Sequence, residues 1–239
     1  MLMQRVPLIL LTLICLIAPR VALAADQRVD LELALAVDAS FSIDDEEFRL
    51  QMAGIAAAFR DPEIQAAIAD GPIGAIAVAL VVWAEPTRPK DVGPWRLLRT
   101  RADAEAFATL VETYPRRVSG GTGIGSGIGV AARHMGRNGY AGTRKVIDVS
   151  GDGQETPARE HVVRLPQARA MADRLGITLN GLAILNEEPE LDAWYRQHVI
   201  TGFGSFVIAA KSLESFAQAM RRKLLREIRH DPNVAVRGE

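Results

Sequence analysis

The chain alternates between apolar runs typical of buried strands and stretches whose apolar side chains recur every three or four residues, as in helices. One run, Ile73 to Trp83, is almost wholly apolar, which indicates a strand covered on both faces. The pattern predicts strands over residues 29–37, 73–83, 95–99, 144–150, 177–185 and 205–209. It predicts helices over residues 43–59, 102–113, 163–175, 191–199 and 213–228, and one from the glycine-rich segment 120–129 to about residue 135.

Strand and helix alternate through most of the chain, so each helix can carry the chain back to the end of the sheet where the previous strand began. This order predicts an α/β fold with a doubly wound, mostly parallel central sheet, helices on both faces and one short edge strand. We expect one domain over residues 25–230 and a C-terminal tail over residues 231–239. Sheets of this type bind ligands outside the carboxyl ends of their strands.

The first 24 residues have the layout of a secretory signal peptide. Arg5 precedes an apolar run from Val6 to Ala18, and Ala22-Leu23-Ala24 forms a small-x-small cleavage pattern. The run is short for a membrane span, although an uncleaved anchor is the alternative interpretation. We expect cleavage after Ala24 and therefore a bacterial protein that is periplasmic or secreted.

Composition narrows the functional classes only slightly. Hydrophobic residues make up 49% of the chain and charged residues 24%, which is ordinary for a soluble globular protein. The formal net charge is −1, so nothing favours binding to nucleic acid. Cleavage after Ala24 would remove Arg5 and Arg20, giving −3, and would remove Cys15, the single cysteine. A mature chain without thiols suits an oxidising compartment.

Hydroxyl and carboxyl side chains follow the predicted strands at the edge where such sheets bind ligands. Asp38, Ser40 and Ser42 come directly after the first strand, and alternate side chains can converge in a tight loop. Thr122 lies between glycines at the start of a helix, and Asp152 follows the strand over residues 144–150. We therefore expect these five side chains to gather at one edge of the sheet.

Two carboxylates and three hydroxyls are a set of hard oxygen ligands, which suits Mg²⁺, Mn²⁺ or Ca²⁺ better than zinc or copper. With only two carboxylates, the positive charge of the ion would stay partly uncompensated and some of its coordination positions would stay open. The ion could therefore attract a carboxylate from outside. Ser40 or Ser42 could alternatively cap the helix expected from Ile43 onward. Capping and metal binding do not exclude each other.

The sequence Asp38-x-Ser40-x-Ser42, followed by Thr122 and then by Asp152-Gly153, resembles the metal-ion-dependent adhesion site (MIDAS) of von Willebrand factor type A (vWA) domains. The resemblance covers residues 29–228 and is nearest to an uncharacterised group of exported bacterial proteins with this Rossmann-like fold. It implies that Ser40 and Ser42 ligate the metal directly, Thr122 directly or through water, and the two aspartates largely through water.

Members of that family generally bind proteins, and the partner supplies a Glu or Asp side chain to the metal. The resemblance therefore predicts an exported adhesion or scaffold module that is not an enzyme. A metal-dependent hydrolase of the cell envelope and an envelope scaffold with a structural metal are the alternatives. The hydrolase is disfavoured because no histidine, lysine or further carboxylate is placed as an obvious base.

Three other features have simpler interpretations. Segment 120–129 lacks the lysine of a nucleotide-binding P-loop. Asp148 lies inside a predicted strand and is expected to support the site from below or to pair with a basic residue such as Arg144 or Lys145, because an unpaired buried charge is costly. The last helix has a basic face, which predicts a solvated surface or, less simply, contact with anionic lipid or an acidic partner. Its residues are Arg221, Arg222, Lys223, Arg226 and Arg229.

Overall fold

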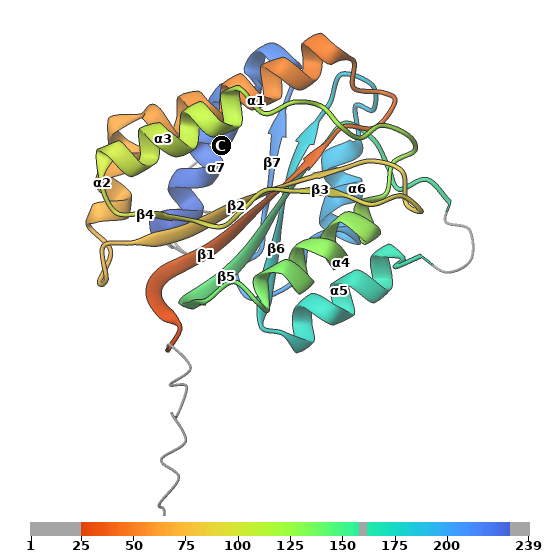
Figure 1. The fold of residues 1–239 in the computed structure, drawn as a ribbon. Coiled ribbons are helices and arrows are strands. Elements are labelled where there is room, and N and C mark those ends of the chain that lie inside the picture. Colours follow the sequence, from red (N-terminus) through yellow and green to blue (C-terminus); the bar gives the residue numbers. More distant parts are fainter. Residues whose placement is uncertain (1–24, 158–161, 230–239) are drawn as a thin grey trace, which may run out of the picture.

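A computed structural model describes residues 25–157 and 162–229 of the chain (Figure 1). The expected signal peptide over residues 1–24, its cleavage and the expected tail over residues 231–239 lie outside the described residues. None of the helices in the described ranges has the length and apolar character needed to cross a membrane.

Seven strands of the described chain form a single sheet in the order β3-β2-β1-β5-β6-β7, and β4 pairs with β2 beside β3. Five neighbouring strands of the sheet are parallel, namely β2, β1, β5, β6 and β7, whereas β3 and β4 run antiparallel to β2. The strands are β1 (Gln27–Asp38), β2 (Ile76–Trp83), β3 (Asp91–Val92), β4 (Arg96–Leu98), β5 (Tyr140–Gly151), β6 (Ile177–Ile184) and β7 (Val207–Ala210). The predicted fold class is confirmed, but the edge has two short strands where the sequence indicated one.

Helices cover both faces of the sheet, as Figure 1 shows. One face carries α1 (Asp45–Arg60), α2 (Pro62–Ala69), α3 (Arg101–Glu112) and α7 (Phe216–Arg229), the last preceded by the 3₁₀ turn η1 (Leu213–Ser215). The other face carries α4 (Ile124–Met135), α5 (Leu165–Arg174) and α6 (Leu191–His198). The pair Asp61-Pro62 ends α1 and also starts α2, because Asp61 caps the new N-terminus.

The two faces of β1 differ in side-chain size. Leu31, Leu33 and Leu35 pack into the core beneath α1 and α7, and Ala34 and Ala36 face the core beneath α4. Small side chains on that second face leave room for a helix at close range.

Helix α4 is rich in glycine because it packs closely against the sheet. It begins at Ile124, so Gly125, Gly127 and Gly129 are helical. A Cβ atom on Gly127 would lie only 2.8 Å from the Trp83 side chain. Close packing, not phosphate binding, therefore accounts for this part of the glycine-rich segment.

Asp148 makes its ion pair with α7 and not with a neighbour on its own strand. The Lys223 ammonium lies 2.8 Å from Asp148 Oδ1 and 2.6 Å from Glu227 Oε1, and all three side chains are buried. Arg144 instead donates to the carbonyl oxygens of Glu227 (2.8 Å) and Ile228 at the end of α7. The expected pairing of Asp148 with a basic residue is confirmed, but the partner is Lys223 and not Arg144 or Lys145.

The predicted solvated basic face of the last helix is found at Arg222 and Arg229, which are exposed, but not at Lys223. Lys223 is fully buried, and Arg221 and Arg229 form ion pairs with carboxylates of the α1–α2 region. The Arg226 guanidinium lies 3.8 Å from the centre of the Phe206 ring. These side chains fasten α7 to the rest of the molecule.

Candidate metal centre

The candidate site lies at the carboxyl ends of the two central strands. Strands β1 and β5 are hydrogen-bonded neighbours, with Val37 opposite Ser150, so the loops that follow them start side by side. Asp38 ends β1, and Asp152 follows Gly151 at the end of β5. Parallel pairing thus brings together two carboxylates that are 114 positions apart in the sequence.

Hydrogen bonds connect four of the five residues that the sequence singled out. Ser42 Oγ donates to Asp152 Oδ1 at 2.6 Å, and the hydroxyl oxygens of Ser40 and Ser42 are 3.2 Å apart. The backbone N–H of Ser40 donates to Asp38 Oδ1 at 2.7 Å. The three side chains of the first loop therefore converge with Asp152, as the alternating spacing predicted.

Thr122 approaches from the segment in front of α4. A Cβ atom on Gly153 would lie 4.0 Å from Thr122 Oγ1, so the threonine hydroxyl faces the segment that carries Asp152. Two hydrogen bonds with Thr156 hold the backbone of Thr122, one from Thr122 N to Thr156 Oγ1 and one from Thr156 N to Thr122 O, each 2.9 Å. The structure thus places all five predicted residues at the same edge of the sheet.

The serines do not cap α1. Asp44 is the N-cap residue, and its carboxylate accepts from the Glu47 N–H while the Glu47 side chain accepts from the Asp44 N–H. The alternative interpretation of Ser40 and Ser42 as capping residues is therefore wrong, and their hydroxyls remain available at the edge of the sheet.

The two aspartates have buried oxygen atoms that nothing in the described chain satisfies. Asp38 Oδ2 and Asp152 Oδ2 have no hydrogen-bond partner among the described residues. Burial, and then the charge of Asp152, raise the pKa of Asp38 to about 7. Burial also raises the pKa of Asp152, an effect that the hydrogen bond from Ser42 opposes. Unsatisfied buried carboxylate oxygens are costly, and a bound cation would satisfy them.

The donor set indicates which kind of cation fits. Within residues 25–157 and 162–229, no three His, Cys, Asp or Glu side chains gather into a group that could hold a metal. A metal at this edge would therefore depend on serine and threonine hydroxyls as well as on the two carboxylates. Such oxygen ligands suit a hard divalent ion, and their low total charge leaves it electrophilic.

Tyr195 of α6 lies directly beneath the carboxylates. Its hydroxyl is buried and has no hydrogen-bond partner among the described residues. A Cβ atom on Gly151 would lie 2.7 Å from Asp38 Oδ2 and 2.8 Å from the Tyr195 hydroxyl oxygen, so only glycine leaves both groups in place. Burial, and then the charge of Asp38, raise the pKa of Tyr195, which therefore stays a neutral hydrogen-bond donor. No motif in the sequence marks this tyrosine.

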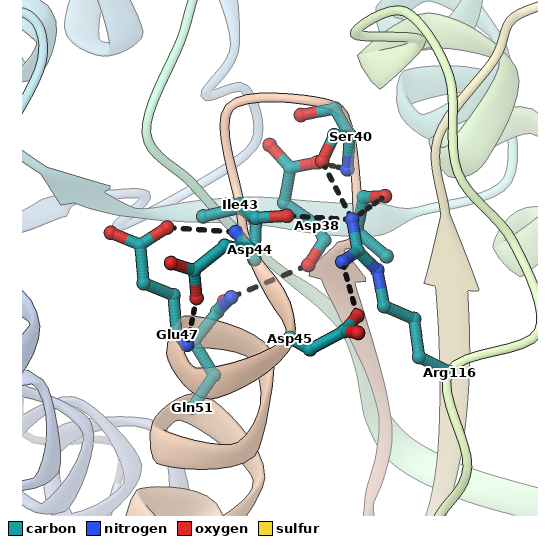
Figure 2. Close-up of polar contacts among 9 residues, drawn as sticks. Asp38, Ser40, Ile43, Asp44, Asp45, Glu47, Gln51 and Arg116 are labelled. Atoms are coloured by element: carbon teal, nitrogen blue, oxygen red, sulfur yellow. Dashed lines mark hydrogen bonds and ion pairs between the residues drawn. The ribbon is translucent and has the colours of Figure 1, made fainter.

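Arg116, which no sequence motif marked, holds the loop that follows β1 (residues 39–44) from the side (Figure 2). One guanidinium nitrogen, Nη2, donates to the backbone carbonyls of Ala39 (3.2 Å), Ser40 (3.1 Å) and Ile43 (2.6 Å). The other, Nη1, lies 2.7 Å from Asp45 Oδ1. Arg116 belongs to the segment between α3 and α4, which also carries Thr122, so it joins the two halves of the site.

Two further carboxylates hold the Thr122 segment and were also missed. Glu85 Oε2 accepts from the N–H of Gly121 at 3.1 Å. Glu155 accepts from the N–H of Gly125 (2.7 Å) and of Leu165 (3.0 Å), which ties the start of α4 to the start of α5. Both lie outside the predicted site motif in the sequence, and only the folded chain brings them to it.

Comparison with solved structures shows the fold. Proximal thread matrix protein 1 (PTMP1) from the mussel byssus has a TM-score of 0.60 and 14% sequence identity, over 85% of this chain and 48% of that chain. The same mussel protein with a zinc-occupied MIDAS motif has a TM-score of 0.57 and 15% identity, over 86% and 50%. The chain thus spans about half the length of the mussel protein structures.

The vWF domain of the type V pili tip protein Mfa5 from Porphyromonas gingivalis has a TM-score of 0.52 and 14% identity, over 88% of this chain and 98% of that domain. At such identities the likeness establishes the α/β fold of a vWA-type domain and nothing about ligands. Among curated proteins, none matches the chain. The model of the family described as "Protein of unknown function (DUF1194)" matches residues 28–232, and the chain therefore belongs to that family.

Proposed function

We propose that the protein is an exported adhesion or scaffold module that binds a protein partner through a divalent cation. Asp38, Ser40, Ser42, Thr122 and Asp152 would hold the cation, directly or through water. The partner would supply an Asp or Glu carboxylate to a position that the chain leaves open. Mg²⁺ is the expected ion, with Mn²⁺ or Ca²⁺ as substitutes.

One observation carries the proposal. Two buried carboxylates, each with an unsatisfied oxygen, converge with serine hydroxyls at the carboxyl edge of the sheet. Burial penalises both charges, so the arrangement is unfavourable until something positive joins it. An ion bound by mostly neutral hydroxyls and two carboxylates would keep enough charge to recruit a third carboxylate.

The similar structures support a role in binding. One is a protein of the mussel byssus whose MIDAS motif holds zinc, and another is the vWF domain of a pilus tip protein. The signal-peptide pattern of residues 1–24 separately supports export of the protein. Zinc belongs in the test because it occupies the motif of the mussel protein.

Calorimetric titration of chelator-treated protein with Mg²⁺, Mn²⁺, Ca²⁺ and Zn²⁺ tests the metal site. We expect Asp38→Asn to lower the affinity for Mg²⁺ at least about tenfold, because an amide keeps the shape of the side chain and loses its charge. Asp70→Asn is the matched control, since Asp70 is an exposed aspartate at the end of α2. If Asp38→Asn does not fold, Ser42→Ala replaces it, because Ser42 is exposed.

Unchanged Mg²⁺ affinity in the folded variants would contradict the proposed assignment of the metal ligands. The partner role is tested by recovery of envelope proteins in Mg²⁺ and their release by chelator. Recovery that chelator does not affect would mean that the metal is structural. Metal-dependent turnover of a phosphoester or a peptide would favour the hydrolase instead.

A further inference from the structure

A large apolar side chain lies exposed on the loop that follows β1 (residues 39–44). Phe41 stands between Ser40 and Ser42, and 79% of it is exposed. Its backbone is fixed, because Phe41 N donates to the carbonyl of Gly120 at 2.8 Å and Arg116 holds the carbonyls on either side of the loop. A fixed loop that presents a phenylalanine to solvent is typical of a binding surface.

A surface hollow of about 420 Å³ lies beside Phe41, on the side of the site that carries Thr122. Phe41 and Pro86 give it an apolar wall, and Gly120, Thr156 and Arg88 complete its rim. Glu85 also lines the hollow, but its carboxylate is directed to the N–H of Gly121. The hollow is therefore bordered by Gly120, in the segment that carries Thr122.

The charges around the metal site are divided between two sides. Arg88 is exposed, and its guanidinium makes no hydrogen bond or ion pair with any described residue. The opposite side is acidic, since Glu47 and Glu187 act electrostatically on Asp152 and Glu188 accepts from the N–H of Gln154. A segment with more than one acidic side chain is therefore attracted to the Arg88 side and repelled from the other.

We propose that the hollow beside Phe41 is the second half of the binding surface and selects the segment that the metal captures. The occupant is a partner segment in which an apolar side chain next to the metal-bound carboxylate packs on Phe41, while a further acidic side chain faces Arg88. This inference rests on the proposed function, because the metal supplies the first contact. It adds a sequence preference that a metal alone would not have.

A surface carrying synthetic octapeptides tests the inference with the full chain in Mg²⁺ and in chelator. Each peptide has a central Glu, then Leu or Ser at the next position, and Asp or Lys two residues beyond that position. A matching set has Gln in place of the central Glu. We expect the Leu-Asp peptide to bind about tenfold more tightly than the Ser-Asp peptide, and several-fold more tightly than the Leu-Lys peptide.

Variants connect each preference to one side chain. Phe41→Ser should abolish the preference for Leu over Ser, and Arg88→Glu should reverse the preference for Asp over Lys. Because each preference is a ratio measured within one variant, a general change in metal affinity cancels. Phe203→Ser and Arg101→Glu are the controls, since Phe203 is 82% exposed and both residues lie away from the carboxyl edge.

The outcomes separate the two proposals. Equal binding of the Glu and Gln peptides, or binding that chelator does not affect, would overturn the proposed function and this inference with it. Mg²⁺-dependent binding of the Glu peptides with preferences that Phe41→Ser and Arg88→Glu leave unchanged would overturn this inference alone. Preferences that change in these variants and not in the controls would support it.

Discussion

Arg116 is a single side chain that organises the loop after β1 (residues 39–44) without being one of the proposed metal ligands. Its guanidinium satisfies three backbone carbonyls and one carboxylate at once, which a lysine ammonium cannot do from one position. One of these carbonyls belongs to Ser40, a proposed ligand, so removing the Arg116 contacts would directly free the backbone of that residue.

We expect Arg116→Lys to lower the affinity for Mg²⁺ by about 10- to 100-fold, the usual effect of removing a group that orients metal ligands. Calorimetry well below the unfolding temperature measures it without interference from stability. Arg117→Lys is the matched control, because Arg117 is exposed and forms one ion pair, with Asp91. A lower melting temperature with unchanged Mg²⁺ affinity would show that the Arg116 contacts serve stability only.

At this scale the sequence revealed the residues next to strand ends and missed those placed by tertiary contacts. Asp38, Ser40 and Ser42 could be found because their spacing after a strand is local, and Asp152 because it follows a second strand of the same kind. Arg116 and Tyr195 reach the site only through the packing of segments far away in the chain. That the five residues bind a metal stays a prediction.

At the scale of elements, α7 is fastened to the central strand β5 by buried charges. The Lys223 ammonium lies between Asp148 and Glu227, and Asn180 donates to Glu227 Oε1 at 2.8 Å. Two carboxylates share one ammonium, so one negative charge is in excess when both carboxylates are ionised. Burial raises the pKa of Asp148 to about 7, and Lys223 opposes this shift.

This buried cluster predicts a pH dependence of stability. Asp148 has an ordinary pKa of about 4 in the unfolded chain and a raised one in the folded chain. Between about pH 4 and pH 7 the folded chain therefore keeps a proton that the unfolded chain releases, so this residue makes the free energy of unfolding fall as pH rises. Asp148→Asn should flatten that part of the profile, as urea unfolding at several pH values would show.

Lys223→Met is the contrasting variant, because it leaves two buried carboxylates without a cation. We expect it to lower the free energy of unfolding by about 3 to 5 kcal/mol at pH 8. The loss should be smaller at pH 5, where Asp148 can be protonated. An equal loss at both pH values would contradict the assigned charges.

Helical periodicity alone could not reveal this cluster. The sequence showed the basic residues of the last helix and the strand position of Asp148, but not which of them meet. Lys223 and Glu227 are four residues apart on α7, and that spacing fits an exposed pair as well as a buried one. Only the position of α7 on the sheet decides between them.

At the scale of the whole molecule, the expected metal would join segments that are distant in the sequence. The loops after β1 and β5 and the start of α4 all contribute to the site. A ligand that binds only the folded chain stabilises it, by about 2.7 kcal/mol at a hundredfold excess over its dissociation constant. For a domain of this size that corresponds to a rise in melting temperature of about 5 to 10 °C.

Thermal unfolding in Mg²⁺ and in chelator measures this rise. Asp38→Asn should show no rise at the same Mg²⁺ concentration, whereas Asp70→Asn should behave as the wild type. A rise of the same size in Asp38→Asn would mean that Mg²⁺ acts elsewhere on the protein.

The fold class could be predicted because strand and helix signals alternate and the central strands are apolar on both faces. The short strand β3 could not, since two residues within a turn-rich stretch carry no periodic pattern. Its pairing depends on β2 being present first.

The position of β1 has a mechanical consequence. This 12-residue strand runs from Gln27 at one end of the sheet to Asp38 in the proposed metal site, and it is hydrogen-bonded to β2 on one side and to β5 on the other. If a partner pulls on the metal while the chain is held near Gln27, the load runs along β1. Because both points of attachment lie on β1, its own backbone carries the load, and the two flanking ladders of hydrogen bonds hold the strand in place. The strand that carries the first proposed metal ligand is thus also the strand along which tension would pass.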